Sequence, residues 1–383
     1  MNNIIIDGNY FFYKTLFVIT GYAKKGESAL DSEDHQNIFI RKVATDIAHS
    51  IRFFGSPNRI IFTIDSRSWR KDVDIEENEG YKAHRKQSTE INWDNFYKCM
   101  NEFAATMETK GWITSQVEAA EGDDLMYLWS QYFLKKKQNS IIITGDHDIH
   151  QTVRAGGDNW VVVFNPNSKS RRIYGQKGLS EFLAEKNETT SLDIFNPASF
   201  MKTGRDMINR ALDRVELTEL VPNDFLVNKV LMGDGGDGVP TVFSWVSKSK
   251  KGKETVNRLT PKRIEKIVDY VKKQINGPIR VFDMPDLAYH ITKGIQIVTK
   301  QKEIDIDVIK SKIERNIKLM VLHKDVLPPE IISDFNTHFE ERFNEPTLAG
   351  QTYDMHSLLE GTRFAKDPDS FQAGIFGQLD KKK

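Results

Sequence analysis

Acidic residues that could bind a metal ion or act as acids in catalysis are concentrated between residues 121 and 150. Glu121, Asp123 and Asp124 come directly before apolar residues spaced three and four positions apart, which predicts a helix with one buried face. Acids in the first turn of a helix can hold a cation, but they are also ordinary caps because they accept hydrogen bonds from free backbone N–H groups. Both interpretations are open at this position.

Two more acids, Asp146 and Asp148, follow an apolar run at residues 140 to 144. Its consecutive isoleucines are typical of an interior strand of a parallel sheet. Open α/β sheets bind ligands at the carboxyl ends of their strands, so two acids one residue apart in this position indicate a cation site. A solvated turn is the alternative interpretation of this short segment.

The same arrangement occurs elsewhere in the chain. Asp7 and Asp65 each follow a short apolar run, and Asp234 and Asp237 lie on a glycine-rich turn after a helical pattern at residues 225 to 232. If these carboxylates share one cleft, their like charges force some of them to bind protons unless cations are present. The sequence therefore predicts a metal-dependent site.

Hard oxygen ligands without a cysteine cluster favour Mg²⁺ or Mn²⁺ over a structural zinc ion. A pair of such ions could stabilise both the attacking and the leaving oxygen of a phosphodiester. We therefore expect two Mg²⁺ or Mn²⁺ ions. The expected ligands are Asp7, Asp65, Glu121, Asp123 and Asp124 around the first ion and Asp146, Asp148, Asp234 and Asp237 around the second.

The order of these motifs resembles that of the flap endonuclease, or 5′-nuclease, family, and within it the phage ribonuclease H group. The resemblance covers roughly residues 1 to 345. Each motif is weak alone, but the ordered set is specific. The motifs are Ile6-Asp7-Gly8, Asp65, Trp69-Arg70, Tyr81-Lys82 with Arg85, Glu121 with Asp123-Asp124, Gly145-Asp146 with Asp148, Gly233-Asp234 with Asp237, Thr260-Pro261 and Leu327-Pro328-Pro329-Glu330.

The resemblance implies a 5′ to 3′ exonuclease and flap endonuclease that hydrolyses RNA primers or DNA flaps in phage-type DNA replication. Lys82 and Arg85 would be catalytic residues that neutralise the scissile phosphate, within a helical arch at about residues 66 to 95. Positive groups that follow phosphates and aromatic rings that stack on bases hold single strands. The expected nucleic-acid-binding residues are Trp69, Arg70, Tyr81 and Lys86 in this segment, and Lys248, Lys250, Lys251, Lys262 and Arg263 downstream.

The expected fold is α/β, with a mostly parallel central sheet flanked by helices, as in the PIN-like core of that family. The apolar runs at residues 4 to 6, 59 to 64 and 141 to 143 should lie side by side, with their aspartates on one edge. The predicted organisation has three parts: a nuclease core at 1–222 with a helical insert at about 175–222, a helical duplex-binding region at 223–345, and a tail at 346–383. Where the family has a glycine-rich turn between two helices, this sequence has a lysine-containing segment at residues 239 to 257.

Composition places further limits on the function. Lys plus Arg and Asp plus Glu each number 54, so the formal charge is zero and any nucleic acid must be bound by local basic patches. The single cysteine, Cys99, excludes an internal disulfide and indicates a reducing compartment. No apolar run approaches the length needed to span a membrane. We expect a cytoplasmic monomer, in the host cytoplasm if the chain is phage-encoded.

The expected partners are branched or primer-containing DNA and RNA/DNA duplex. Apolar residues in the tail, among them Phe371 and Phe376, could dock on a sliding clamp or a single-strand-binding protein, or could fold back onto the body of the protein.

Two other functions are compatible with parts of the pattern. A haloacid-dehalogenase-like phosphatase has similar acidic motifs, but it needs a nucleophilic Asp-x-Asp on the first strand, and residue 9 is Asn. A non-catalytic binder of branched DNA would have no need for so many acids.

Overall fold

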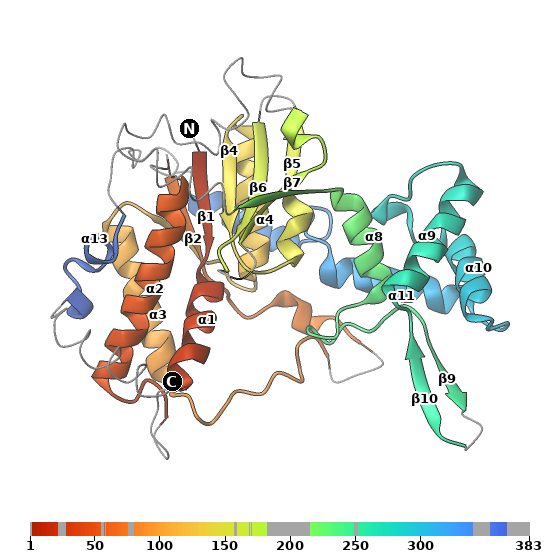
Figure 1. Cartoon of the computed structure of the whole chain (residues 1–383), viewed down its shortest axis with the longest axis horizontal. Coiled ribbons are helices and arrows are strands. Elements are labelled where there is room, and N and C mark those ends of the chain that lie inside the picture. Colours follow the sequence, from red (N-terminus) through yellow and green to blue (C-terminus); the bar gives the residue numbers. More distant parts are fainter. Residues whose placement is uncertain are drawn as a thin grey trace.

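The computed structural model of the chain describes residues 2–21, 28–54, 57, 59–75, 80–156, 159–167, 169, 171–181, 215–248, 252–339 and 353–365. Its central element is a sheet with helices packed on both faces, and a lobe of further helices lies beside the sheet (Figure 1).

The strands of the sheet follow the order β3-β2-β1-β4-β6-β7-β8. Neighbours from β3 to β6 are parallel, β7 is antiparallel to β6 and parallel to β8, and β5 pairs with β6 in antiparallel fashion. Ile4 lies opposite Ile60 of β2 and Ile141 of β4, so the three apolar runs are neighbours as predicted. The strands are β1 (Asn2–Asp7), β2 (Arg59–Thr63), β3 (Ile113–Ser115), β4 (Asn139–Ile143), β5 (Arg154–Gly156), β6 (Asn159–Asn165), β7 (Arg172–Gln176) and β8 (Glu216–Leu220).

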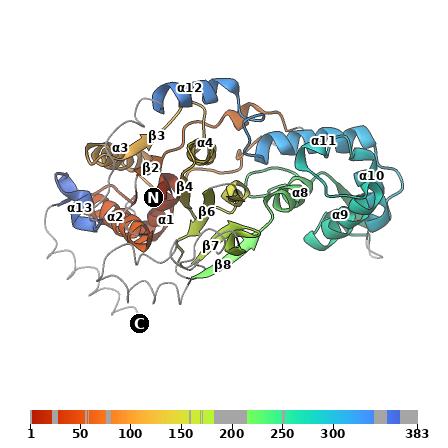
Figure 2. The same ribbon diagram turned by 90° about the horizontal axis from the view of Figure 1, so that it is seen from above.

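Consecutive isoleucines serve both faces of this sheet because side chains alternate along a strand. Ile4 and Ile6 pack in the core on one face, and Ile5 packs with Trp129 in the core on the other. Figure 2 shows the two layers of helices from above. The first face is covered by α1 (Gly8–Thr20), α2 (Glu33–Phe54) and α3 (Trp93–Thr109), and the second by α4 (Gly122–Lys135) and α12 (Pro329–Phe339).

The helical lobe has a hydrophobic core of its own. Asn316 ties its helices together by donating to the carbonyl oxygens of Val230 (2.8 Å) and Pro240 (3.0 Å). None of the described helices is long and apolar enough to cross a membrane. The lobe contains α8 (Pro222–Met232), α9 (Pro261–Ile275), α10 (Ala288–Thr299) and α11 (Ile306–Met320), and a separate hairpin of β9 (Ser244–Lys248) and β10 (Glu254–Arg258).

The segment expected to be a helical arch runs from the sheet to the lobe and back before α3 begins (Figure 1). In its described residues, 66–75 and 80–92, the only helical turn is the 3-10 helix η1 (Trp69–Asp72). The charged and aromatic residues of the segment follow no helical period. Single side chains of the segment instead contact the lobe or the sheet. We call this segment the connecting segment.

The predicted insert and the predicted tail can be compared with the structure. The predicted insert lies mostly at residues 182–214, outside the described residues, and the described part on its C-terminal side forms β8 at the edge of the sheet. The predicted tail began at residue 346, but residues 353–365 belong to the core. Phe364 is 1% exposed, and its carbonyl oxygen accepts a hydrogen bond from the Arg41 guanidinium (3.1 Å). The short helix α13 (Met355–Leu359) packs on α2.

This packing leads to a stability prediction. Phe364→Ala should lower the free energy of unfolding by about 3 kcal/mol, because it leaves a cavity in a buried cluster. Phe17→Ala is the matched control, since Phe17 is 71% exposed and its truncation should change stability little. Urea unfolding followed by circular dichroism measures both. Equal effects of the two substitutions would show that residues 353–365 are not part of the core.

Candidate active site

The carboxyl ends of β1 and β4 bring the first acids together. Asp7 ends β1 and caps α1, since its Oδ1 accepts a hydrogen bond from the Tyr10 N–H (2.9 Å). Thr144, directly after β4, donates to Asp7 Oδ2 (2.6 Å) and accepts from the Asp146 N–H (3.0 Å). Sequence reasoning missed Thr144, although a hydroxyl residue between a buried strand and an acidic turn is a recognisable signal. It fixes Asp7 and Asp146 relative to each other.

The end of β2 and the start of α4 complete this group. Asp65 accepts a hydrogen bond from the backbone N–H of Gly122, the first residue of α4 (2.6 Å). A Cβ atom on Gly122 would lie 2.8 Å from Asp65 Oδ1, so a glycine is needed here for the helix to approach the strand end. Asp123 then faces Asp146 and Asp7, the strongest charged neighbours of its carboxylate.

The pKa values of these acids report on their crowding. Burial, opposed by hydrogen bonds and reinforced by the charges of Asp65 and Asp146, raises the pKa of Asp7 to about 7. Burial and the neighbouring carboxylates of Asp146 and Asp7 also hold the pKa of Asp123 well above its ordinary range. These groups therefore favour a bound proton or a bound cation over a free negative charge.

A second acidic group lies where the sheet meets the lobe. One carboxylate oxygen from each of Asp148, Asp234 and Asp237 lies within 4.8 Å of the others, an arrangement that could hold a metal ion. Asp234 and Asp237 sit on a tight turn after α8 that Gly233 permits, because its φ of +73° is in the left-handed region and a Cβ there would lie 2.5 Å from the backbone of Val239. Asp148 and the glycine-rich turn are thus brought together, whereas Asp146, which was expected in the same ligand set, lies beside Asp7 and Asp123.

Lys229 is the functional residue that sequence reasoning missed most clearly. It is buried on α8, its ammonium group contacts Asp148, and it forms an ion pair with Asp234 (3.1 Å). Although burial opposes ionisation, the charges of Asp148 and Asp234 raise the pKa of Lys229. A lysine on the same helical face as Leu226 and Val230 was the available signal, since a buried lysine requires an acidic partner.

Lys82 and Arg85, the predicted catalytic residues, lie at this site on the connecting segment. Lys82 Nζ is 2.6 Å from Glu121 and 3.8 Å from Asp237, and Arg85 forms an ion pair with Asp237 (2.5 Å). Burial opposes the ionisation of Glu121, but Lys82 and Arg70 lower the pKa of its carboxyl group. Arg85 is exposed, and the Lys82 side chain is 22% exposed, so both can reach a ligand.

Asp124 and three predicted nucleic-acid-binding residues are corrected by the structure. Asp124 is fully buried, and the Arg70 guanidinium binds both of its carboxylate oxygens (2.7 and 2.9 Å). The Asp124 side chain also accepts from the Trp69 indole N–H (3.3 Å) and from the backbone N–H of Glu121 (3.1 Å), so it acts as a capping and ion-pairing residue inside the protein. Capping, the alternative interpretation, is confirmed for this residue.

Arg70, Trp69 and Tyr81 are buried, with exposed fractions of 2%, 8% and 5%, and so they cannot stack on bases or follow phosphates. Arg70 also donates to the carbonyl oxygen of Leu319 in the lobe (2.9 Å), and Tyr81 donates to Glu121 and Asp237. They were misassigned because basic and aromatic residues in a non-periodic segment look the same whether they face water or not. Of the other expected contacts, Lys86, Lys248 and Lys262 are exposed, Arg263 is partly exposed, and Lys250 and Lys251 lie outside the described residues.

The donor set fits divalent cations. The acids that remain available as ligands are Asp7, Asp65, Asp123, Asp146, Asp148, Asp234 and Asp237. All of them offer oxygen, which suits Mg²⁺ or Mn²⁺, and Glu121 is occupied by Lys82, Arg70 and Tyr81.

The site combines acids at the ends of sheet strands with further acids from the helical lobe. Residues 2–183 match the model of the 5′-3′ exonuclease N-terminal resolvase-like domain. Just under half of the chain is therefore similar to this exonuclease domain, and the predicted fold class is confirmed.

Solved structures of bacteriophage T5 proteins share this fold. The T5 flap endonuclease in a product complex with DNA and metal ions is 14% identical, covers 90% of this chain and 100% of its own, and has a TM-score of 0.50. The T5 5′-exonuclease with bound zinc ions is 15% identical and has the same TM-score. The match covers 89% of this chain and 99% of the T5 chain. No curated protein matches the chain.

The raised pKa of Asp7 predicts a pH dependence of stability in the metal-free protein. An unfolded Asp titrates near pH 4, so between about pH 4 and 7 the folded state binds more protons at Asp7 and stability falls as pH rises. Asp7→Asn should therefore be increasingly more stable than the wild type across this range, by up to about 1.4 kcal/mol per pH unit. Burial and the neighbouring His147 lower the pKa of His150 to about 4, which makes stability rise with pH. This contribution is the same in both proteins and cancels when they are compared. Urea titrations in EDTA measure the difference, and a constant difference would contradict the prediction.

The buried ion pair predicts a structural role for Arg70. Arg70→Leu should destabilise the protein by about 3 kcal/mol or more, because the buried side chain of Asp124 would lose its ion pair. The double variant Arg70→Leu/Asp124→Asn should recover part of this loss, since Asn carries no charge and can still accept the Glu121 N–H. Denaturant unfolding provides the measurement. If Arg70 instead contacted nucleic acid, its replacement would alter the salt dependence of binding and leave stability unchanged.

Proposed function

We propose that the protein is a metal-dependent 5′-nuclease that hydrolyses phosphodiesters of DNA flaps or RNA primers using two Mg²⁺ or Mn²⁺ ions. The observation that carries this proposal is the convergence of two acidic groups on one edge of the sheet. Asp7, Asp123 and Asp146 form the first group, and Asp148, Asp234 and Asp237 form the second. Asp65 would join the first group.

Bound ions would supply an activated water and stabilise the leaving oxygen. The residues of the chain hold and orient the substrate. Lys82 and Arg85 provide positive charge at the edge of the acidic groups, where a scissile phosphate would lie. Lys229 holds Asp148 and Asp234 in place.

The substrate and the biological setting are also proposals. The T5 relative was solved in a complex with DNA and metal ions, which supports branched DNA as the substrate of this chain. Ribonuclease H-like removal of RNA primers in phage replication, in the host cytoplasm, extends the same reasoning. The C-terminal tail would supply contacts to a sliding clamp or a single-strand-binding protein.

The structure offers an observation against the phosphatase alternative. Asn9 occupies the position where that enzyme class needs its second aspartate, and its side-chain oxygen accepts a hydrogen bond from the Asp65 N–H (3.1 Å). Asn9 thus orders the strand ends, and it has no acid to donate a proton to a leaving group. We therefore favour phosphodiester hydrolysis.

Removal of one acid should abolish cleavage without preventing binding. Asp146→Asn and Asp123→Asn should slow single-turnover cleavage of a labelled flap substrate by at least about 100-fold, because preorganised charge stabilisation is lost. Binding with Ca²⁺ in place of Mg²⁺ should be unchanged or tighter, since repulsion within the site is reduced. Asp334→Asn, an exposed acid on α12, is the control and should behave as the wild type. Near-normal cleavage by Asp146→Asn would refute the metal assignment and reopen the phosphatase and DNA-binder alternatives.

A further inference from the structure

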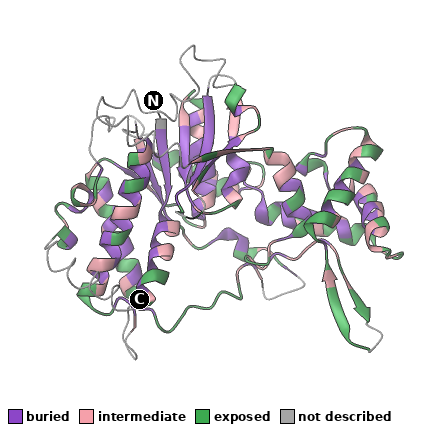
Figure 3. Cartoon of the chain, viewed as in Figure 1, coloured by how far each residue is buried: buried purple, intermediate pink, exposed green. Residues whose placement is uncertain are grey.

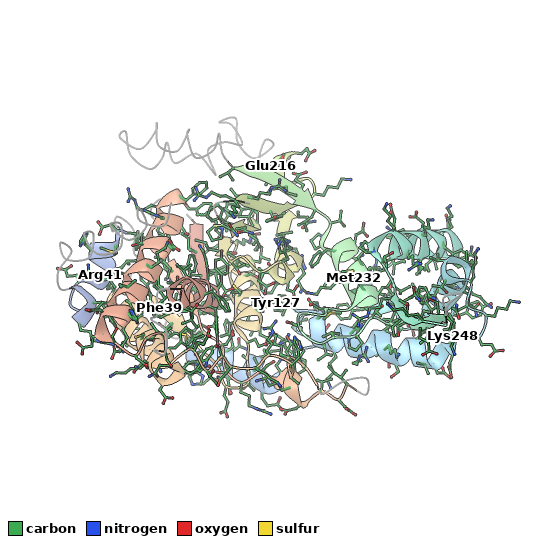
Figure 4. The ribbon with its side chains drawn as sticks, turned by 60° about the horizontal axis from the view of Figure 1, so that its bottom comes forward. Phe39, Arg41, Tyr127, Glu216, Met232 and Lys248 are labelled. Carbon is green, nitrogen blue, oxygen red and sulfur yellow. The ribbon has the colours of Figure 1, made fainter. Side chains whose placement is uncertain are left out.

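The β9–β10 hairpin is a two-stranded sheet that stands apart from the central one. No other strand in the described part of the chain pairs with β9 or β10. It leaves the lobe between α8 and α9, and Figure 1 shows it pointing away from the helices. Lys248 at the end of β9 lies far from the sheet (Figure 4). The hairpin occupies the place where the sequence departs from the family pattern.

One face of the hairpin anchors it to the lobe. Trp245, opposite Asn257 in the register, is only partly exposed and packs against the core of the lobe. Its ring stacks with that of Phe243 at 5.8 Å between centroids, and the Arg263 guanidinium lies 4.9 Å from it. Asn257 donates to Ser247 Oγ (2.9 Å) across the strands. These contacts hold the base of the hairpin in a fixed direction.

The other face is apolar in the middle and carries charge at both ends. Val246 lies opposite Val256, and they are 55% and 63% exposed. Ser244 and Arg258 form the pair on one side of them, and on the other side Lys248 forms an exposed ion pair with Glu254 (2.9 Å). Figure 3 shows that both strands are largely exposed. A pair of exposed β-branched residues between basic residues is a contact surface without a partner in the described chain.

Charge and dimensions indicate what this face contacts. Residues 244–258 contain five basic residues and one acid, although the whole chain has a formal charge of zero. Such a segment attracts a polyanion. Five residues per strand give a ribbon of roughly 17 Å, and a two-stranded ribbon fits the major groove of DNA, about 12 Å wide, but not the minor groove of about 6 Å.

We propose that the β9–β10 hairpin lies in the major groove of the duplex arm of the substrate. Val246 and Val256 would contact base edges and thymine methyl groups, and Lys248 and Arg258 would reach phosphates on either side. The proposal rests on the proposed function, because it assumes a substrate with a duplex arm. The hairpin follows the turn that carries Asp234 and Asp237 within a few residues, so it would align the duplex with the acidic groups.

The first test removes charge. Lys248→Gln/Arg258→Gln should weaken binding to a flap duplex in Ca²⁺ and reduce its salt dependence. Two phosphate contacts correspond to about a tenfold change in affinity between about 50 and 200 mM salt. Lys135→Gln/Lys302→Gln removes the same charge from exposed positions at the far end of α4 and after α10, and should leave affinity and salt dependence unchanged. Equal behaviour of the two variants would overturn the phosphate contacts.

The second test identifies the groove. Methylation of guanine N7, a major-groove atom, should interfere with wild-type binding at positions within the duplex arm, and this interference should disappear in Val246→Ser/Val256→Ser. The proposal is overturned if the interference is the same in the variant or is absent from the wild type. Absence of interference is the result expected if the hairpin binds another protein instead of DNA. Wild-type cleavage of the flap in Mg²⁺ is measured in parallel. If the wild type cleaves but the hairpin tests fail, only this inference falls, whereas a wild type that does not cleave contradicts the proposed function.

Discussion

The carboxylates gathered at the ends of the parallel strands repel one another, and the arrangement of the other charged residues depends on this repulsion. The chain offsets part of this repulsion with cations from other elements: Lys229 from α8 and Lys82 and Arg85 from the connecting segment. The compensation is uneven. Despite burial, Lys229 lowers the pKa of Asp234, but burial still raises the pKa of Asp148 in the same group to about 6. Burial and the neighbouring acids raise the pKa of Asp7 to about 7. Both acidic groups therefore favour a bound divalent cation.

The connecting segment keeps the two acidic groups in register. Arg70 binds Asp124 at the start of α4 and the Leu319 carbonyl oxygen at the end of α11, which links the sheet to the lobe through one buried side chain. Further along, the Lys82 N–H donates to the Asp237 carbonyl oxygen (2.8 Å). A second link joins Gln151, in the 3-10 helix η2 (Asp148–Thr152), to the backbone of Met320 and Leu322. The site is formed by the sheet and the lobe together, so its geometry depends on hydrogen bonds that lie outside the site.

The sequence was sufficient where one physical signal dominated. Apolar runs ending in aspartate located β1, β2 and β4 and their shared edge, because buried parallel strands need apolar residues on both faces. The sequence was insufficient where the surroundings of a side chain in the fold decide what that side chain does. Asp123 and Asp124 are adjacent and chemically identical, yet one faces other carboxylates and the other is bound by Arg70. Lys229 could be found only by asking what neutralises a buried lysine, and its partners are distant in sequence.

The pairing of acids with cations also couples phosphate binding to the charge of the site. Lys82 and Arg85 can reach a phosphate, but in this structure their charges are used by Glu121 and Asp237. A cation shared between a carboxylate and a phosphate binds each less strongly than it would bind one alone. Arg85 also donates to the carbonyl oxygen of Gly236 (3.1 and 3.0 Å), so its position is fixed by the backbone of the turn as well as by the carboxylate of Asp237. Tyr81 donates to both Glu121 and Asp237 and holds these acids in place. A phosphate at this site would therefore compete with Glu121 and Asp237 for cations that the protein has already positioned.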